Sequence, residues 1–506
     1  MNTKDNRILR RCKRNLARRL DSRTWTDQPK PILTAGNVRY EMSDRVRAIS
    51  CGGIGAFLQL AQRVGLVEAI DQRLHLFKRH LPYHESDHVL NLAFNALAGG
   101  TCLDDIEMRR QDEVYLDALG AERIPDPTTA GDFTRRFAEK DVLTLMEAVN
   151  AVRVKFWRER LTDAERREAI LDVDGTLAPT TGECKEGMGL SYNGVWGYHP
   201  LIVSLANTRE PIYVVNRPGN RPSHEGAVAW MDRAAARVRE GGFERVIFRG
   251  DTDFSLTGDF DRWDAEGKGF AFGMDAMANL VKIAETVDER AWKPLNRRIE
   301  RVAQAVRRRR PENVKERIVV EKEYENIRLT GETVAETSYR PMKCQRDYRL
   351  VIVKKDLSVE RGERLLFEDV RYFFYITNLM EKSAEDVVRF ANARCDQENL
   401  IEQLKNGLNA LRMPVGDLVS NWAYMVMASL AWTLKTWFAL VMRRGERRTR
   451  LLRMEFRRFR QALVEVPAQI VKTGRRIVYR ILGYNDWVRT LLGTFERIRK
   501  LKWGVT

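Results

Sequence analysis

The sequence has few cysteines, and none of them stands in a paired motif. Its six cysteines are scattered along the chain without any CxxC spacing. This distribution argues against a disulfide framework and is typical of reduced cytosolic thiols. The first residues are positively charged, but no apolar segment of the signal-peptide kind follows them. We therefore expect a cytoplasmic protein rather than a secreted one.

The sequence also lacks a clean membrane span. Residues 418–442 are largely apolar and precede Arg443 and Arg444, but they include Lys435 and several hydroxyl and amide side chains. A lysine in the middle of a span costs roughly 3 kcal/mol on insertion scales. We predict a helix buried in a large protein core, and no membrane partner.

Positive charge is plentiful and is concentrated at the two ends. The chain has 506 residues and a net charge of +17, with 44% hydrophobic residues, so it has the composition of a folded protein of about three units. Residues 1–20 hold eight basic and one acidic residue, and residues 443–506 hold eighteen basic and five acidic residues. The body between them is nearly neutral. Basic ends of this kind indicate a polyanionic partner, either nucleic acid or an anionic membrane surface.

Changes in pattern divide the chain into six predicted segments. We predict a basic N-terminal arm (1–45), a helical region (46–160), the first part of an α/β core (165–275), a β-rich insertion (276–380), the second part of the core with a long helix (381–442), and a mostly helical basic C-terminal region (443–506). Within the last segment, a helix is predicted at 446–465 and a β-hairpin at 470–479. The short helices of 46–160, separated by Gly or Pro, are typical of helix-turn-helix DNA-binding regions and equally of any small helical domain.

Alternating strand and helix patterns predict a mixed α/β core with at least one parallel crossover. Strands are predicted at 169–174, 200–205, 211–216, 245–249 and 269–273, and helices at 225–240 and 256–266. Within the insertion, strands are predicted at 317–320, 348–353 and 372–377, after a basic stretch containing Arg307, Arg308, Arg309 and Arg310. A solvated helix end is the plainer interpretation of that arginine run.

Carboxylates at two strand ends indicate a metal site. Asp174 ends the first strand, and Asp251 follows a strand that could lie beside it. Strand ends converge in such a sheet, so the two side chains could share a divalent ion. Asp172 and Asp253 are the nearest competitors for these two positions.

A third carboxylate lies on a helix predicted from 384 to 411. Arg394, Glu398, Glu402 and Lys405 form one stripe beside its apolar face. Spacing alone favours an ordinary charged flank. If the stripe faces the site instead, Glu398 is the third ligand and Glu402 its competitor.

Two other motifs match known sites less well. His84-Glu85-Ser86-Asp87-His88 matches the HExxH zinc motif, but Ser86 or Asp87 is the expected helix cap, which leaves His84 outside the helix. The segment Asp172–Leu177 resembles the first motif of haloacid-dehalogenase phosphatases, with Ser204 and Asp251 as further matches. However, no lysine lies between Ser204 and Asp251 to neutralise a phosphoryl group.

Taken together, several motifs resemble those of bacterial insertion-sequence DDE transposases with a β-rich insertion between the second Asp and the Glu. The resemblance rests on LDVDGT, FRGDTDF, GYHPLIVSLANTREPIYVVNRPGN and RCDQENLIEQLKNG. Arg394, Glu398 and Lys405 match the family spacing Tyr-x2-Arg-x3-Glu-x6-Lys, while Ala391 stands at the tyrosine position, with Phe390 one residue earlier.

The resemblance implies a fold, a site and partners. It implies an RNase H-like core whose Asp174, Asp251 and Glu398 hold two Mg²⁺ ions, with Mn²⁺ as a substitute. It implies that Arg394, Lys405 and the 307–310 run contact DNA. The expected function is binding of terminal inverted repeats, followed by cleavage and strand transfer into target DNA, by a homodimer associated with the bacterial nucleoid. An inactive DNA-binding descendant remains the alternative.

Overall fold

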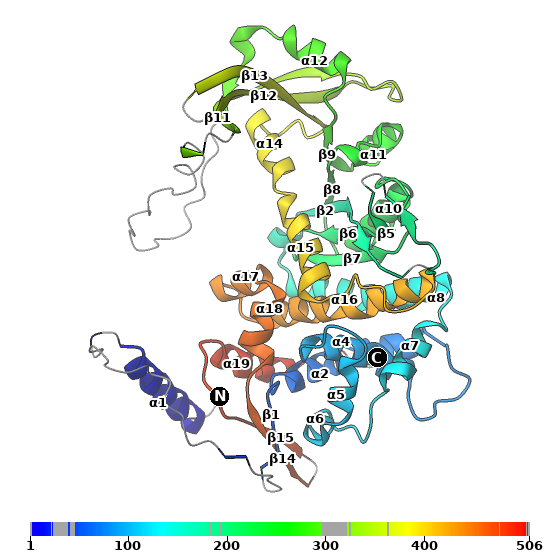
Figure 1. The fold of residues 1–506 in the computed structure, drawn as a ribbon, viewed down its shortest axis with the longest axis vertical. Coiled ribbons are helices and arrows are strands. Elements are labelled where there is room, and N and C mark those ends of the chain that lie inside the picture. Colours follow the sequence, from blue (N-terminus) through cyan, green and yellow to red (C-terminus); the bar gives the residue numbers. More distant parts are fainter. Residues whose placement is uncertain are drawn as a thin grey trace.

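The computed structural model describes residues 3–21, 23, 39–40, 46–182, 184–191, 194–295, 321–322, 325–361, 364–474, 476–501 and 503. The molecule is elongated, with strands reaching one end and a helical body at the other (Figure 1). The arginine run 307–310 and the strand predicted at 317–320 lie outside the described residues.

A nine-stranded sheet contains the predicted core strands. Its central order is β7 (Glu210–Val215), β6 (Leu201–Leu205), β2 (Glu168–Gly175), β8 (Arg245–Gly250) and β9 (Gly269–Met274). Strands β2, β8 and β9 are parallel to one another, whereas β6 runs antiparallel to both of its neighbours, β2 and β7. The prediction of mixed α/β structure with a parallel crossover is confirmed. Helices cover both faces of the sheet, so nearly every side chain of these strands is buried. This is why the strands are continuous apolar runs in the sequence.

The two faces of the sheet are covered by different helices. Helix α10 (Ala227–Glu240) contacts β2, β6 and β8, while α14 (Ala384–Asn392) and α15 (Cys395–Glu402) contact β9 and β2. Side chains alternate along a strand. Asp172 and Asp174 therefore share one face of β2, and the Asp172–Arg249 pair, joined to the carbonyl of Phe390 on α14, identifies it as the face of α14 and α15.

The β-rich insertion continues the core sheet. β11 (Glu325–Tyr339), β12 (Tyr348–Arg361) and β13 (Arg364–Thr377) are antiparallel, β10 (Lys293–Pro294) pairs with β11, and residues 374–377 of β13 pair with β9. Sequence patterns missed β11 and more than half of β12 and β13. The outer halves of β11 and β13 are largely exposed, so they carry no buried apolar face for a pattern to detect, whereas the outer half of β12 is partly buried at residues 357–359.

The helical body is built around α16 (Leu418–Val441). This helix has the length and hydropathy of a membrane span, but its apolar window is entirely buried against α4 (Glu85–Leu97), α8 (Glu139–Arg160), α2 (Ile54–Arg63) and β7. Lys435 lies 3.5 Å from the ring centroid of Trp432, and burial lowers its pKa well below the usual range. The predicted core helix is confirmed.

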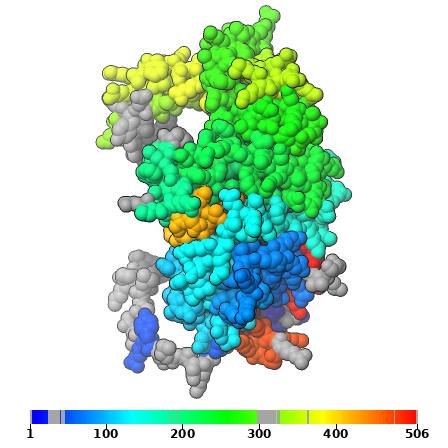
Figure 2. All heavy atoms as spheres, turned by 90° about the vertical axis from the view of Figure 1, so that its right-hand side faces the viewer, coloured from blue at the N-terminus to red at the C-terminus, as the bar shows by residue number. Residues whose placement is uncertain are grey.

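The C-terminal region joins the same body. β1 (Ala48–Ile49) pairs with β14 (Ala468–Thr473), which forms the predicted hairpin with β15 (Arg476–Ile481), and α19 (Val488–Ile498) contacts α2. In Figure 2, the blue and cyan atoms of the N-terminal part of the chain lie below the green atoms of the core. The predicted segments 46–160 and 443–506 therefore pack together.

The remaining elements are short, except for α1 (Thr3–Arg19), which has no buried residue and lies in the arm that was not predicted to be helical. They are α3 (Leu66–Asp71), α5 (Asp105–Arg110), α6 (Glu113–Leu119), α7 (Pro127–Thr134), α9 (Asp163–Arg166), β3 (Ala178–Pro179), β4 (Gly189–Leu190), β5 (Trp196–Tyr198), α11 (Phe260–Ala265), α12 (Ala278–Glu285), α17 (Glu446–Leu452) and α18 (Phe456–Phe459).

Two predicted continuous helices are broken. The helix predicted at 384–411 bends between α14 and α15 and then forms a π-helical turn at Gln403–Gly407. Its two halves pack on different parts of a twisted sheet, which a straight rod cannot follow. The helix predicted at 446–465 is likewise divided into α17, α18 and a π-helical turn at Arg460–Val464.

Candidate active site

Strand register brings Asp174 and Asp251 to the same edge of the sheet. In the parallel pair of β2 and β8, Asp172 lies opposite Arg249. Asp174 and Asp251 each follow two residues later, and neighbouring strands of a sheet are spaced about 4.8 Å apart. Asp251 is held by its own turn, because its Oδ1 accepts a hydrogen bond from the backbone N–H of Asp253 at 3.1 Å.

Arg394, the residue before helix α15, links Glu398 on that helix to Asp251. Arg394 Nη1 lies 3.4 Å from Glu398 Oε1 and 3.7 Å from Asp251 Oδ2. A single guanidinium group thus lies between two of the three predicted carboxylates. The bend after α14 is what places Arg394 over the sheet edge, so the break that the sequence missed is part of the site.

The three carboxylates repel one another in a partly buried setting. The pKa of Asp174 is raised to about 7, mainly by burial and then by the charges of Asp251 and Glu398, while Arg394 opposes the shift. Burial also raises the pKa of Asp251. Oxygen donors whose ionisation is disfavoured until a cation arrives fit a divalent metal ion.

Lys405 lies on the same side as the carboxylates, whereas Glu402 is exposed. Burial lowers the pKa of the half-buried Lys405, and the charges of Glu402 and Asp174 oppose this. The exposed Glu402 accepts a hydrogen bond from Asn406 Nδ2 at 2.8 Å, within its own helical turn. Of the stripe predicted from the sequence, Arg394, Glu398 and Lys405 are therefore gathered at the site.

Asp172, the competitor for the Asp174 position, is already engaged. Its two oxygens accept hydrogen bonds from Arg249 Nε at 2.6 Å and Nη2 at 2.7 Å, in a pair that is almost fully buried. Arg249 also donates to the carbonyl of Phe390 and lies 5.0 Å from that ring. This pair ties β2 and β8 to α14, which makes Asp172 a structural residue.

His199 and Arg217 pack beside Asp174, and the sequence motifs did not identify them as residues of the site. Arg217 donates from Nε to the carbonyl of His199 at 2.9 Å and from Nη1 to the carbonyls of Ser223 and Glu225. Both lie against Gly175, the neighbour of Asp174. The signal for them was present in GYHPLIVSLANTREPIYVVNRPGN, which contains both residues.

Replacing Gly175 by Ala tests this packing. A Cβ there would lie 2.9 Å from His199 Nε2, so we expect the free energy of unfolding to fall by about 1–3 kcal/mol. Urea denaturation of the purified chain measures it. Gly493→Ala, at an open position in the exposed part of α19, is the control and should raise stability by about 0.5–1 kcal/mol. Equal stability of Gly175→Ala and wild type would contradict the packing.

The HExxH segment does not form the zinc-protease geometry. Helix α4 begins at Glu85 with His84 as its N-cap, so the predicted caps Ser86 and Asp87 are wrong, but His84 does lie outside the helix. His88 is buried, stacks on Phe133 at 4.3 Å, and has its pKa lowered to about 4 by burial. His80, His84 and Glu85 do cluster. However, the two histidine rings are stacked at 3.9 Å and 14°, so their in-plane lone pairs do not converge.

Helix α7 begins at Pro127, and Asp126 is its cap, accepting from the backbone N–H of Thr129 at 2.8 Å. Proline at the first helical position fits this start, because it has no N–H to satisfy there.

Comparison with known proteins gives one family. No curated protein matches the chain. Among solved structures, a cryo-EM structure of the piggyBac transposase synaptic complex with hairpin DNA matches 89% of this chain and 86% of that one, at 12% identity and a TM-score of 0.34. The profile of the family described as "Transposase DDE domain group 1" matches residues 37–503. The protein thus belongs to the group 1 family of DDE-domain transposases.

Proposed function

We propose that this DNA transposase is an active enzyme of the insertion-sequence type, working in the bacterial cytoplasm. It binds the terminal inverted repeats of its own element as a homodimer, cleaves their strands, and joins them to target DNA. The observation that carries the proposal is the meeting of Asp174 and Asp251 with Glu398 through the guanidinium of Arg394. The order β7-β6-β2-β8-β9, with β6 antiparallel to β2, supports an RNase H-like core.

Domains of this family use divalent metals in general. Asp174, Asp251 and Glu398 would hold Mg²⁺ or Mn²⁺, since all three offer carboxylate oxygens. Two ions held there would supply activation of an attacking water or 3′-hydroxyl and stabilisation of charge on the leaving 3′-oxygen. The chain supplies phosphate contacts beside them. Arg394, released from its carboxylate partners once their charge is neutralised, and Lys405 would hold the DNA backbone.

Metal affinity should depend on pH in the range set by Asp174. Its pKa of about 7 lies above the usual Asp value, so protons compete with the metal below pH 7. We expect Mn²⁺ affinity, measured by titration calorimetry, to weaken steadily as pH falls from 8 to 6. The metal-free protein should lose stability as pH rises from about 4 to 7, because the folded state keeps a proton that the unfolded state has released. Asp174→Asn should weaken both trends and leave only the part that the raised pKa of Asp251 contributes. Trends of unchanged size in that variant would assign them to another group.

The direct test is cleavage of a DNA duplex carrying the terminal repeats that flank the gene. Wild-type protein should nick the repeat end with Mg²⁺ or Mn²⁺ and not with EDTA. Binding without cleavage under all conditions would favour the inactive DNA-binding descendant. A phosphatase of the haloacid-dehalogenase kind would need Asp172 as nucleophile, and the ion pair with Arg249 opposes that role.

A further inference from the structure

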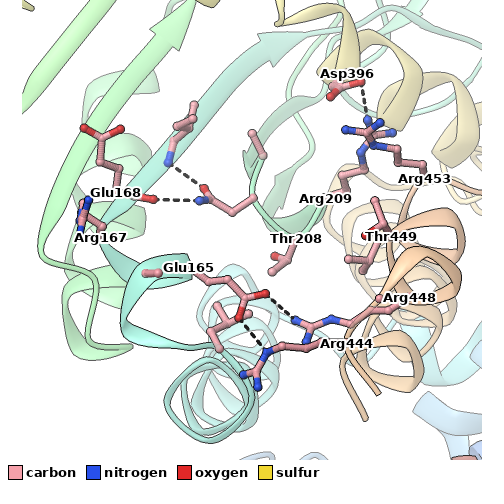
Figure 3. Close-up of a pocket in the computed structure, with 17 residues that line it drawn as sticks. Glu165, Arg167, Glu168, Thr208, Arg209, Asp396, Arg444, Arg448, Thr449 and Arg453 are labelled. Carbon is pink, nitrogen blue, oxygen red and sulfur yellow. Dashed lines mark hydrogen bonds and ion pairs between the residues drawn. The ribbon is translucent and has the colours of Figure 1, made fainter. Parts of the chain in front are cut away.

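A cleft of about 520 Å³ lies beside the core sheet, and its lining does not include Asp174, Asp251 or Glu398. It is bordered by the start of β2, the turn between β6 and β7, α15 and α17 (Figure 3). Five arginines line it: Arg167, Arg209, Arg444, Arg448 and Arg453. Only three carboxylates accompany them, so the cleft carries an excess of positive charge.

The available carboxylates do not neutralise the arginines. Glu165 is shared between Arg444 at 3.3 Å and Arg448 at 3.2 Å. A second carboxylate, Glu168, is 3.3 Å from Arg245, which lies outside the cleft. Asp396, the third, is 2.6 Å from Arg209.

Two exposed arginines of the cleft remain unpaired. Neither Arg167 nor Arg453 has a side-chain partner in the described parts of the chain. Arg453 lies close enough to Arg209 for its charge to lower the pKa of Arg209, in addition to the larger effect of burial. Figure 3 shows these two guanidinium groups together beside Asp396. Like charges held this close repel, and an anion between them would be stabilised by both.

The turn that carries Arg209 is rigid and strained. Arg209 has φ +59°, a left-handed conformation that favours Gly, Asn or Asp over arginine. Trp432 Nε1 donates to its carbonyl at 2.6 Å. Asn207 fixes the turn to β2, accepting from the N–H of Ile170 at 3.0 Å and donating to the carbonyl of Glu168 at 2.8 Å. An arginine at this position indicates that its side chain, not its backbone, is what the site requires.

We propose that this cleft binds phosphates of the DNA backbone outside the cleavage site. The proposal rests on the proposed function for the identity of the polyanion. Guanidinium groups fit phosphate oxygens in a two-pronged geometry, and α17 and the strained turn present several of them to one point. Helix α15 carries both Asp396, at the cleft, and Glu398, at the carboxylate site.

The spacing of the two sites fits a single duplex. Ile170 lines the cleft, and Asp174 lies four residues further along β2, a separation of about 13 Å at roughly 3.3 Å per residue. Each base pair rises about 3.4 Å along the duplex axis, so 13 Å corresponds to about four base pairs. The phosphate held in the cleft is therefore expected about four nucleotides from the scissile one.

The double variant Arg167→Ala/Arg453→Ala of the full chain tests the cleft by fluorescence anisotropy on a random-sequence duplex. Each lost phosphate contact lowers the slope of log Kd against log salt by about one, so we expect a slope shallower by about two and weaker binding at low salt. Arg233→Ala, at an exposed position on α10 at the other face of the sheet, is the control and should bind as wild type does. An unchanged slope and affinity in the double variant would overturn the proposal.

A second measurement locates the phosphate. Single neutral methylphosphonates are placed along a terminal-repeat duplex, and binding is compared between wild type and the double variant. Substitution about four nucleotides from the cleavage point should weaken wild type and leave the double variant unaffected; equal weakening of both would overturn the placement. Failure of cleavage by wild type would refute the proposed enzyme without changing the random-duplex result, so the two failures are distinguishable.

Discussion

Asp174→Asn, Asp251→Asn and Glu398→Gln should each lower the rate of metal-dependent strand cleavage by about a thousandfold or more. Metal ions contribute several kcal/mol to transition-state stabilisation, and each 1.36 kcal/mol is a factor of ten in rate. Each substitution removes the negative charge of a proposed metal ligand while keeping the size of the side chain. DNA binding should persist, because the basic surfaces are untouched. Single-turnover cleavage of the terminal-repeat duplex, with binding measured in parallel, checks both expectations.

Glu402→Gln is the matched control for Glu398→Gln. Both residues lie on α15, but Glu402 is exposed and hydrogen-bonded within its own turn. It should retain most of the cleavage rate. The opposite pattern, in which cleavage survives Glu398→Gln and is lost in Glu402→Gln, would move the third ligand to Glu402.

Glu210→Ala should destabilise the protein more than any surface substitution, by about 3–5 kcal/mol, because it leaves the buried Arg153 without its partner. Glu210 on β7 is fully buried. It accepts hydrogen bonds from Arg153 Nε at 3.2 Å, from Trp157 Nε1 and Trp437 Nε1 at 2.9 Å each, and from Thr208 Oγ1 at 2.6 Å. One carboxylate thus joins the sheet to α8 and α16.

Urea denaturation monitored by tryptophan fluorescence measures this loss. Glu159→Ala, at an exposed position on the same α8, should change stability by no more than about 0.5 kcal/mol. The double replacement of Arg153 and Glu210 by Met should be less destabilising than Glu210→Ala, because no unpaired charge remains buried. A loss below about 1 kcal/mol for Glu210→Ala would show that the network does not hold the layers together.

Local patterns in the sequence were sufficient for the central strands, for α16, and for the meeting of Asp174 with Asp251. Apolar runs bounded by turn residues define buried strands, and polar residues directly after parallel strands share one sheet edge. Glu398, Arg394 and Lys405 followed from the family spacing and not from helical periodicity. That periodicity assumed one straight helix, whereas the chain bends before Arg394 and forms a π-helical turn at 403–407.

Only the tertiary structure decided which charged residues are structural and which are available. The sequence by itself determined the strands, the core helix and the set of candidate carboxylates. It could not show that Asp172 is held by Arg249, that Glu210 is buried among two tryptophans, or that Arg209 and Arg453 share a cleft. These contacts join residues far apart along the chain. The cost of burying a charge, and therefore its role, depends on the partners that folding brings to it.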